Sequence, residues 1–356
     1  MRRDNVMSMQ VVSADEHLVE SCEFWDDWLP GSLPAAMRDR APKRVGPGVA
    51  LDGTTVMRTF TLFPDLVRVS DDAPGATDID ARVAVQRAAG IDAAIVYPQR
   101  AMAMWGIDDH DLRDACFDAY NSWLAAQCSR SGGRLVGVPI LSTVHRPERT
   151  ADAIARLREL GFRTMLLPNY PRDVRYGERD MAPLWSAVEA SGLPLDFHIS
   201  EAPDGNGPGE LGSYLMVSFQ PFRKLWSYLV FAGIFDRHPG LRVVFAEGGI
   251  SWIPSALDHA DRIHREFHAH LRPMLTHEPS HYWHTHCWAT FMDDPRGLDQ
   301  IDHIGADRVL WASDYPHPEG THGHTAAVLA DVVARVGPVA GAAIAGGNAT
   351  AVYGLG

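Results

Sequence analysis

The chain has 356 residues, of which 46% are hydrophobic and 22% are charged. These proportions are typical of globular proteins, and the length is sufficient for a large core. The formal net charge is -13, and no run of lysine and arginine offsets it, which argues against nucleic acid or an anionic membrane as a partner. We expect the partner to be a small molecule.

We find no pattern in the sequence that predicts a targeting segment or a paired cysteine motif. The N-terminal segment has no apolar stretch of signal-peptide length, and no window approaches the roughly 20 apolar residues of a membrane span. We therefore expect a cytoplasmic protein. The cysteines form no CxxC pair and predict neither a disulfide framework nor a thiolate zinc site; they are Cys22, Cys116, Cys128 and Cys287.

Short apolar runs alternate with stretches of helical periodicity along most of the chain. The helical stretches mostly end in glycine just before the next apolar run. Eight strand-then-helix units favour a closed, distorted (β/α)8 barrel over an open sheet, so we predict one domain over residues 1–356. The predicted strands are residues 11–17, 91–98, 135–141, 164–168, 193–199, 241–249, 287–291 and 308–316.

The segment 18–78 interrupts this alternation. It is rich in proline, glycine and aromatic residues and shows no clean helical pattern. Because it follows the first predicted strand, we interpret it as an insertion on the carboxyl face of the barrel, where it would serve as a lid or pocket wall. An irregular stretch that only covers the flank of the barrel is the alternative.

Residues with metal-binding side chains stand at the ends of several predicted strands, where barrel enzymes carry their chemistry. Asp15 and His17 end the first strand, and their spacing places both on one face. His198 ends the fifth strand, Glu247 the sixth and Asp314 the eighth. Imidazole and carboxylate donors suit zinc, iron or manganese, so we predict a divalent-metal site formed by Asp15, His17, His198 and Asp314.

Other interpretations of these histidines and carboxylates remain. Singly, each is explained by a cap, a turn or a core histidine, whereas their joint placement favours a site. His284 and His286 form a rival HxH pair, but they precede the seventh strand and so lie nearer the wrong face. A further group of histidines lies on one amphipathic helix, where a solvated face is expected; these are His259, His264, His268 and His270.

Four runs of sequence resemble a known family. They are ADEHLVE at 14–20, PLDFH at 194–198, FAEGGISWIP at 245–254 and ASDYPHPEG at 312–320. Together they resemble the amidohydrolase-related branch of the amidohydrolase superfamily, which includes aminocarboxymuconate-semialdehyde decarboxylase. The resemblance extends in order over nearly the whole chain. It implies a distorted (β/α)8 barrel with a divalent metal held by Asp15, His17, His198 and Asp314.

One position departs from this family pattern. The decarboxylases carry a catalytic histidine at the end of the sixth strand, where this chain has Glu247. Glu247 is then either a ligand of a second metal or a general base that acts on a metal-bound water. This departure favours hydrolysis over decarboxylation.

We therefore predict a metal-dependent hydrolase of an amide, ester, lactone or acyl-CoA thioester, with one or two ions. The metal would activate water and polarise the carbonyl, and the predicted catalytic residues are Asp314, Glu247 and His198. The alternative is non-oxidative decarboxylation or hydration of an aromatic or unsaturated carboxylic acid, with Arg100 as the clamp on the carboxylate. A barrel that only binds a partner is a third possibility, but such a barrel has no need of these ligands.

Aromatic residues close to the predicted mouth favour a mostly apolar substrate. They are Trp25, Trp28, Phe60, Phe63, Trp105 and Trp252. The histidines His317, His322 and His324 follow the eighth strand and lie within reach of the same mouth. From these sets we predict that Arg100, Trp252, His317 and Trp25 bind the substrate. The segment 222–235 is more apolar than one barrel flank requires, so we also expect a homodimer.

Overall fold

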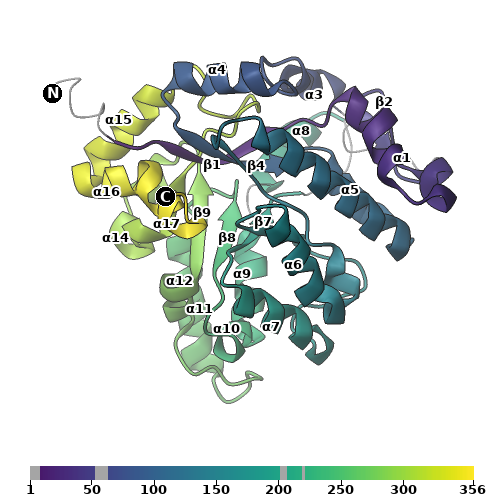
Figure 1. Ribbon diagram of the computed structural model, residues 1–356. Coiled ribbons are helices and arrows are strands. Elements are labelled where there is room, and N and C mark those ends of the chain that lie inside the picture. Colours follow the sequence, from purple (N-terminus) through teal and green to yellow (C-terminus); the bar gives the residue numbers. More distant parts are fainter. Residues whose placement is uncertain (1–8, 53–62, 201–206, 219–220) are drawn as a thin grey trace.

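The computed structural model describes residues 9–52, 63–200, 207–218 and 221–356 (Figure 1). All eight predicted strands are present, each within or next to its predicted position. Their bounds are β1 Val12–Leu18, β4 Ala93–Pro98, β5 Leu135–Gly137, β6 Met165–Leu167, β7 Leu195–His198, β8 Val243–Ala246, β9 Cys287–Phe291 and β10 Val309–Trp311.

These strands form two parallel sheets, in the orders β1-β4-β5 and β10-β9-β8-β7-β6. A parallel bridge between Ile140 and Leu166 joins the sheets at one seam. At the other seam the backbone N–H of Asp314 donates to Asp15 (2.9 Å), and that of His17 donates to Tyr315 (2.8 Å). The two seams close the ring, so the prediction of a distorted (β/α)8 barrel is confirmed.

Helices connect successive strands and surround the barrel (Figure 1). Asp78 caps α4 by accepting from Ala81, and Gly90 ends it in the left-handed conformation, as expected at such a boundary. The principal helices are α4 Ile79–Ala89, α5 His110–Ser129, α6 Thr150–Glu159, α7 Ala182–Ser191, α8 Glu210–Ser218, α9 Phe222–Phe231, α10 Ile234–Arg237, α11 Ile253–Phe267, α12 Pro279–His286, α13 Pro295–Leu298, α14 Ile301–Ile304, α15 Thr325–Val336, α16 Pro338–Ala342 and α17 Asn348–Tyr353. No helix of the described residues is long and apolar enough to cross a membrane.

The C-terminal segment packs against the start of β1. The π-helical turn η9 (Ala343–Gly347) includes Gly346, where a Cβ would lie 2.3 Å from the carbonyl oxygen of Gln10. Only glycine permits this approach. Farther inside the barrel, the hydroxyl of Tyr97 donates to Asp196 (3.0 Å), and Tyr353 of α17 lies against the same carboxyl group.

The predicted insertion contains more regular structure than its sequence suggested. Residues 18–78 include α3 (Pro64–Asp71), which begins at a proline and corrects the expectation of no clean helix. The other elements are η2 Phe24–Trp28, α1 Leu29–Ser32, η3 Ala35–Arg40 and the hairpin of β2 Lys43–Val45 with β3 Gly48–Ala50. Asp71 of α3 pairs with Arg100, directly after β4, so the insertion reaches the carboxyl end of that strand. Its role as a lid or pocket wall stays a prediction.

The apolar helix α9 gives less support for a homodimer than its sequence suggested. Its side chains Phe222, Leu225, Trp226 and Leu229 are already buried within one chain. Their partners lie in the same barrel, where Trp226 contacts the rings of Trp252 and Trp283. The apolarity of this segment is therefore explained by the monomer, and the homodimer stays a prediction.

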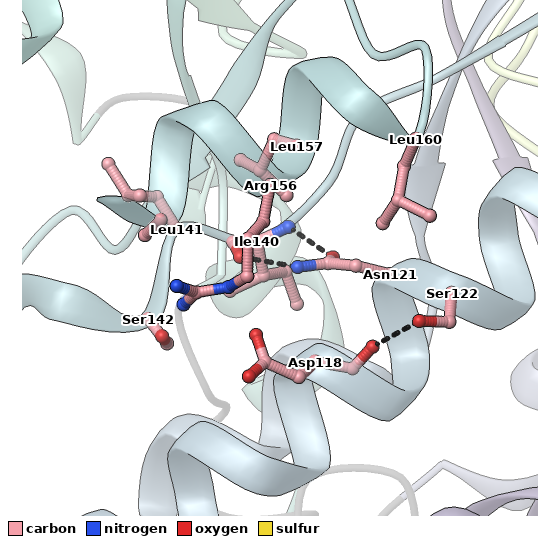
Figure 2. Close-up of a pocket in the computed structure, with 10 residues that line it drawn as sticks. Asp118, Asn121, Ser122, Ile140, Leu141, Ser142, Arg156, Leu157 and Leu160 are labelled. Carbon is pink, nitrogen blue, oxygen red and sulfur yellow. Dashed lines mark hydrogen bonds between the residues drawn. The ribbon is translucent and has the colours of Figure 1, made fainter. Parts of the chain in front are cut away.

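A small groove lies between α5 and α6, and none of the predicted metal ligands lines it (Figure 2). At its base Asn121 makes two hydrogen bonds with the backbone of Ile140, donating from Nδ2 to the carbonyl oxygen and accepting at Oδ1 from the N–H, both at 2.9 Å. Asn121 is 2% exposed. It therefore supports the backbone next to the seam between β5 and β6.

We predict that Asn121→Ala lowers the free energy of unfolding by about 2 kcal/mol, because two buried backbone groups lose their partners. Urea denaturation followed by tryptophan fluorescence measures the change. Ser122→Ala is the matched control, because the exposed Ser122 hydroxyl bonds only to Asp118 of the same helix. Equal midpoints for the two variants would contradict the structural role of Asn121.

Candidate metal centre

The barrel brings five predicted residues together at the carboxyl ends of its strands. His17 Nε2 lies 3.9 Å from Asp15 Oδ1 and 3.6 Å from Asp314 Oδ1. His198 Nε2 lies 3.6 Å from Asp15 Oδ1 and 3.1 Å from Glu247 Oε2. All five side chains are at least 96% buried. Strands 300 residues apart in sequence thus contribute to one cluster.

Backbone carbonyl groups set the orientation of two histidine rings. His17 Nδ1 lies 3.1 Å from the oxygen of Pro98, and His198 Nδ1 lies 2.7 Å from the oxygen of Ile199. A carbonyl oxygen only accepts, so in each neutral ring the hydrogen is on Nδ1. The lone pair on each Nε2 therefore faces the cluster, which is the arrangement that a metal ligand requires.

Several of the clustered atoms have no hydrogen-bond partner among the described residues. They are both carboxylate oxygens of Asp15, Nε2 of His17, Nε2 of His198 and Oδ1 of Asp314. Buried polar atoms are nearly always hydrogen-bonded, and leaving them unpaired costs about 1–3 kcal/mol each. Their convergence fits a cation as the missing partner. The separations of 3.1–3.9 Å are slightly longer than the roughly 3.0–3.5 Å between neighbouring ligand atoms that bonds of about 2.1 Å to one ion produce.

Two of the carboxylates are held in strained backbone. Glu247 has φ 70° and Asp314 has φ 54°, both in the left-handed region that only glycine adopts freely. Such residues cost about 1–3 kcal/mol each and are concentrated at functional sites. The strain turns both side chains inward just after β8 and β10.

The opposite face of β1 anchors the strand that carries Asp15 and His17. Glu16 accepts from Arg82 (3.0 Å), from Gln86 (3.2 Å) and from the hydroxyl of Ser313 (2.8 Å). Arg82 and Glu16 are both almost fully buried. This network ties β1 to α4 and to the segment that precedes Asp314, so it positions ligands from both ends of the chain.

Burial shifts the pKa of every ionisable group in the cluster. It raises the pKa of Asp15 and of Asp314, and burial together with the nearby Asp314 raises that of Glu247 to about 8. Burial and the neighbouring histidines lower the pKa of His17. Burial opposes the charged form of His198, but Asp15 and Glu247 overcome this effect and raise its pKa to about 9. A divalent ion would supply the positive charge that these carboxylates lack.

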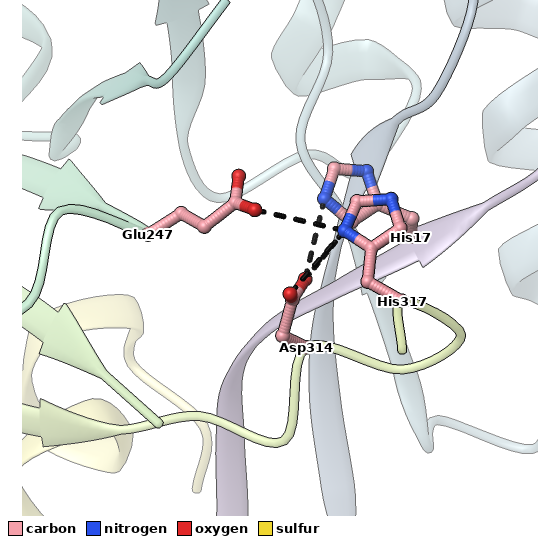
Figure 3. A group of neighbouring side chains, drawn as sticks. All are labelled: His17, Glu247, Asp314 and His317. Carbon is pink, nitrogen blue, oxygen red and sulfur yellow. Dashed lines mark hydrogen bonds and ion pairs between the residues drawn. The ribbon is translucent and has the colours of Figure 1, made fainter. Parts of the chain in front are cut away.

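His317 also lies in the cluster (Figure 3), and its contact with substrate stays a prediction. Its Nδ1 lies 3.0 Å from Asp314 Oδ1, 3.2 Å from Asp314 Oδ2 and 3.6 Å from Glu247 Oε1. Its Nε2 lies 3.0 Å from Oε1 of Gln99. The two possible ligand groups are Asp15, His17 and His198, and His17, Glu247, Asp314 and His317. The short spacing from Asp314 was the sequence signal for His317, whereas Gln99 gave none.

The other residues predicted to bind substrate lie in different surroundings. Arg100 is fully buried, and its guanidinium donates to both oxygens of Asp71 at 2.6 Å. Trp25 packs in the core against Phe24. Trp252 packs against Trp283 and donates to the carbonyl of Gly249. Contacts of these three residues with substrate stay predictions, and Phe60 lies outside the described residues.

The rival histidine pair lies away from the ends of the strands. His284 and His286 end α12, directly before β9. His286 Nδ1 lies 2.9 Å from the carbonyl oxygen of Leu241, which precedes β8. Both histidines therefore lie at the amino ends of their neighbouring strands, opposite the cluster.

We predict that His17→Ala and His198→Ala bind divalent metal about 100-fold more weakly than the unaltered chain, because each removes one inward-facing Nε2 lone pair. Equilibrium dialysis with elemental analysis measures the loss. His270→Ala, which removes an exposed histidine, is the matched control and should bind as the unaltered chain does. Full metal binding by both site variants would contradict the assignment.

Metal affinity should also depend on pH. The pKa of His198 is raised to about 9 without metal, so its imidazole must lose a proton before Nε2 binds an ion. Affinity should therefore rise by up to roughly tenfold per pH unit between pH 7 and pH 9 and fall at lower pH. Calorimetric titration with Mn²⁺ at three pH values tests this. A constant affinity over this range would contradict the loss of a proton from His198 when the ion binds.

Comparison with known proteins places this geometry in context. The amidohydrolase family profile matches residues 22–355, a match that begins after Asp15 and His17. A gamma-resorcylate decarboxylase of Polaromonas sp. JS666 is 25% identical over 260 residues, which cover 68% of this chain and 78% of that protein.

Solved structures agree on the architecture. An amidohydrolase of Mycobacterium avium subsp. paratuberculosis K-10 superimposes with a TM-score of 0.77 at 19% identity, covering 98% of this chain and 99% of that one. A dihydroxybenzoic acid decarboxylase of Polaromonas sp. JS666, solved with manganese and 2-nitroresorcinol, gives a TM-score of 0.69 at 20% identity, covering 98% and 97% of the two chains. At these identities the likeness establishes the fold.

These findings confirm the prediction of an enzyme and correct the predicted reaction. Hydrolysis is wrong, because the curated relative is gamma-resorcylate decarboxylase, which supports the reaction held as the alternative. The error came from Glu247, whose presence at the sixth strand end was given too much weight. Imidazole and carboxylate ligands serve both reactions, so the ligand set could not choose between them.

Proposed function

Because the chain belongs to the amidohydrolase family, we propose that it is a metal-dependent, non-oxidative decarboxylase of an aromatic carboxylic acid. The likeness to gamma-resorcylate decarboxylase supports the reaction class. The convergence of unpartnered buried donors from β1, β7 and β10 supports the metal. The metal depends mainly on that convergence, which needs no relative, whereas the reaction class depends on the relative.

The reaction makes specific demands on the site. The bond between the ring carbon and the carboxylate breaks, carbon dioxide leaves, and the ring carbon takes up one proton. A bound divalent ion would supply positive charge that holds the substrate's oxygens and draws electron density from the ring. The residues proposed to hold this ion are Asp15, His17, His198 and Asp314. Manganese is the first candidate, because a structural neighbour carries it.

The proton must come from an acid beside the ring. Besides Asp15, the carboxyl groups of the cluster are those of Glu247 and Asp314, and burial raises the pKa of both. Glu247 stands where the resemblance to decarboxylases places a histidine. We therefore propose these two groups as the proton-carrying residues, with His198 orienting Glu247 at 3.1 Å.

Recognition of the carboxylate by Arg100 would require a change of partner. The guanidinium is bonded to both oxygens of Asp71, and Asp71 belongs to the insertion. Both bonds come from one nitrogen, Nη2, and a substrate carboxylate would have to compete with Asp71 for this charge-assisted pair. Substrate contacts by Trp25, Trp252 and His317, the homodimer and the cytoplasmic location likewise stay predictions.

We expect the manganese-loaded protein to release carbon dioxide from hydroxylated benzoates, with gamma-resorcylate and 5-carboxyvanillate as the first substrates to test. Product formation by chromatography and carbon dioxide by a coupled assay measure it. Asp314→Asn should reduce kcat at least about 100-fold by removing the carboxyl group from the cluster, and Glu247→Gln should reduce it similarly.

The matched control is Asp307→Asn, which alters an exposed carboxylate just before β10 and should leave turnover unchanged. Metal-loaded protein that releases no carbon dioxide from any hydroxylated benzoate would overturn the proposed reaction. Full turnover by a folded Asp314→Asn variant would overturn the role of that carboxyl group.

A further inference from the structure

We propose that Thr290 of β9 is a positioning residue for Glu247, because its hydroxyl group holds the backbone conformation that directs the Glu247 carboxylate into the cluster. The backbone N–H of Glu247 donates to Thr290 Oγ1 at 2.7 Å, and Thr290 is fully buried. Neither ligand group found among the described residues includes a residue of β9. Thr290 would therefore act on the site through Glu247. The inference rests on the proposed role of Glu247 in proton transfer.

Glu247 is the residue at which the chain leaves β8 and turns into the following loop. Its φ of 70° lies in the left-handed region, which is costly for any residue but glycine. The parallel pairing of β8 with β9 extends to Phe245 opposite Ala289, so the N–H of Glu247 lies beyond it and uses the threonine hydroxyl as its acceptor. A buried N–H needs an acceptor. The bond therefore favours this conformation over one that turns the N–H away from Thr290.

The backbone conformation of Glu247 also sets the direction of its side chain. Figure 3 shows the carboxylate directed toward His317. Oε1 lies 3.6 Å from His317 Nδ1, and Oε2 lies 3.1 Å from His198 Nε2. The bond from Cα to Cβ turns with the backbone, so a return of φ to the ordinary negative region would move the carboxylate away from both imidazole rings.

A second residue after β9 holds the far end of the same loop. Asp294 Oδ2 accepts from the backbone N–H groups of Ile250 and Ser251, both at 2.8 Å. Its Oδ1 accepts from the N–H of Gly297 at 2.9 Å, at the start of α13. The loop is thus bonded at both ends to β9 and the residues that follow it. Of the two anchors, only Thr290 bonds to the residue that carries the carboxylate.

The chemistry of threonine allows the hydrogen bond to be separated from packing. Its branched β carbon restricts χ1, so the hydroxyl of a buried threonine is held in place. Valine has nearly the same shape but no hydroxyl, whereas serine keeps the hydroxyl and loses a methyl group. If Thr290 acts through its hydrogen bond, serine should replace it in function and valine should not.

The experiment combines turnover with a double-mutant cycle in manganese-loaded protein acting on gamma-resorcylate, at metal contents matched by elemental analysis. Thr290→Val should lower kcat about 100-fold with KM little changed, because a displaced catalytic group costs rate more than binding. Thr290→Ser should retain most of the turnover. Added to Glu247→Gln, Thr290→Val should cause no further loss, because the two residues act as a unit.

Thr150→Val is the matched control. Thr150 is also fully buried, and its hydroxyl lies 2.7 Å from that of Thr143 at the start of α6. The substitution removes an equally buried hydroxyl that has no contact with Glu247, so kcat should stay unchanged. A loss equal to that of Thr290→Val would assign the effect to packing and would overturn the proposal.

Crystal structures of Thr290→Val and Thr290→Ser give a measurement that needs no turnover. In the valine variant φ of Glu247 should leave the left-handed region and Oε2 should move away from His198, whereas the serine variant should keep both. Thr290→Ala, which also lacks the hydroxyl, replaces the valine variant if that protein does not fold.

The remaining outcomes separate this proposal from the proposed reaction. Unchanged kcat and an unmoved Glu247 in a folded variant without the hydroxyl overturn the role of Thr290. A further loss of kcat in the Glu247→Gln background overturns its action through Glu247. If the unaltered protein releases no carbon dioxide, the proposed reaction fails, and the crystal structures still decide whether Thr290 positions Glu247.

Discussion

The backbone hydrogen bonds that join β1 to the segment after β10 are the constraint on which the metal centre depends. The backbone N–H of Asp314 donates to the carbonyl of Asp15, and the backbone N–H of His17 donates to the carbonyl of Tyr315. The ligands themselves therefore form the seam. Closing the barrel and assembling the cluster are one event, and the Glu16–Arg82 pair on the outer face of β1 stabilises both. The positive φ values of Glu247 and Asp314 lie within this closed frame, and such strain persists where the surrounding structure holds it in place.

Much of this architecture could be predicted from the sequence. The eight strands were found because each buried strand is a short apolar run bounded by turn residues, a local signal. Asp15, His17, His198 and Asp314 could be placed together because parallel strands in a barrel end on one face. Local patterns do not reveal partners, however. Nothing near Arg100 indicated that Asp71 would neutralise it, and nothing near His317 indicated that Gln99 would orient its ring.

Local sequence patterns also did not reveal the surroundings of the aromatic residues or the reaction. Trp25 and Trp252 appeared close to the mouth in sequence, but side-chain direction places them in the core, which composition cannot show. The apolarity of α9 likewise proved to serve the barrel's own packing. The predicted reaction was wrong because Glu247 alone does not distinguish hydrolysis from decarboxylation, two reactions that use the same metal ligands. The donor atoms of a site indicate which kind of ion it binds, but they do not indicate which reaction that ion supports.

The position of the ligands along the chain has a consequence for biosynthesis. Hydrogen bonds at the seam join residues 300 positions apart, as between Ser13 and Ser313. A nascent chain on the ribosome therefore exposes Asp15 and His17 long before Asp314 has been made. Until about nine-tenths of the polypeptide has emerged, the first strand has no permanent partner on one edge. The full cluster is therefore complete only after the last strand has been made, and chains interrupted before it would expose an open barrel to proteases.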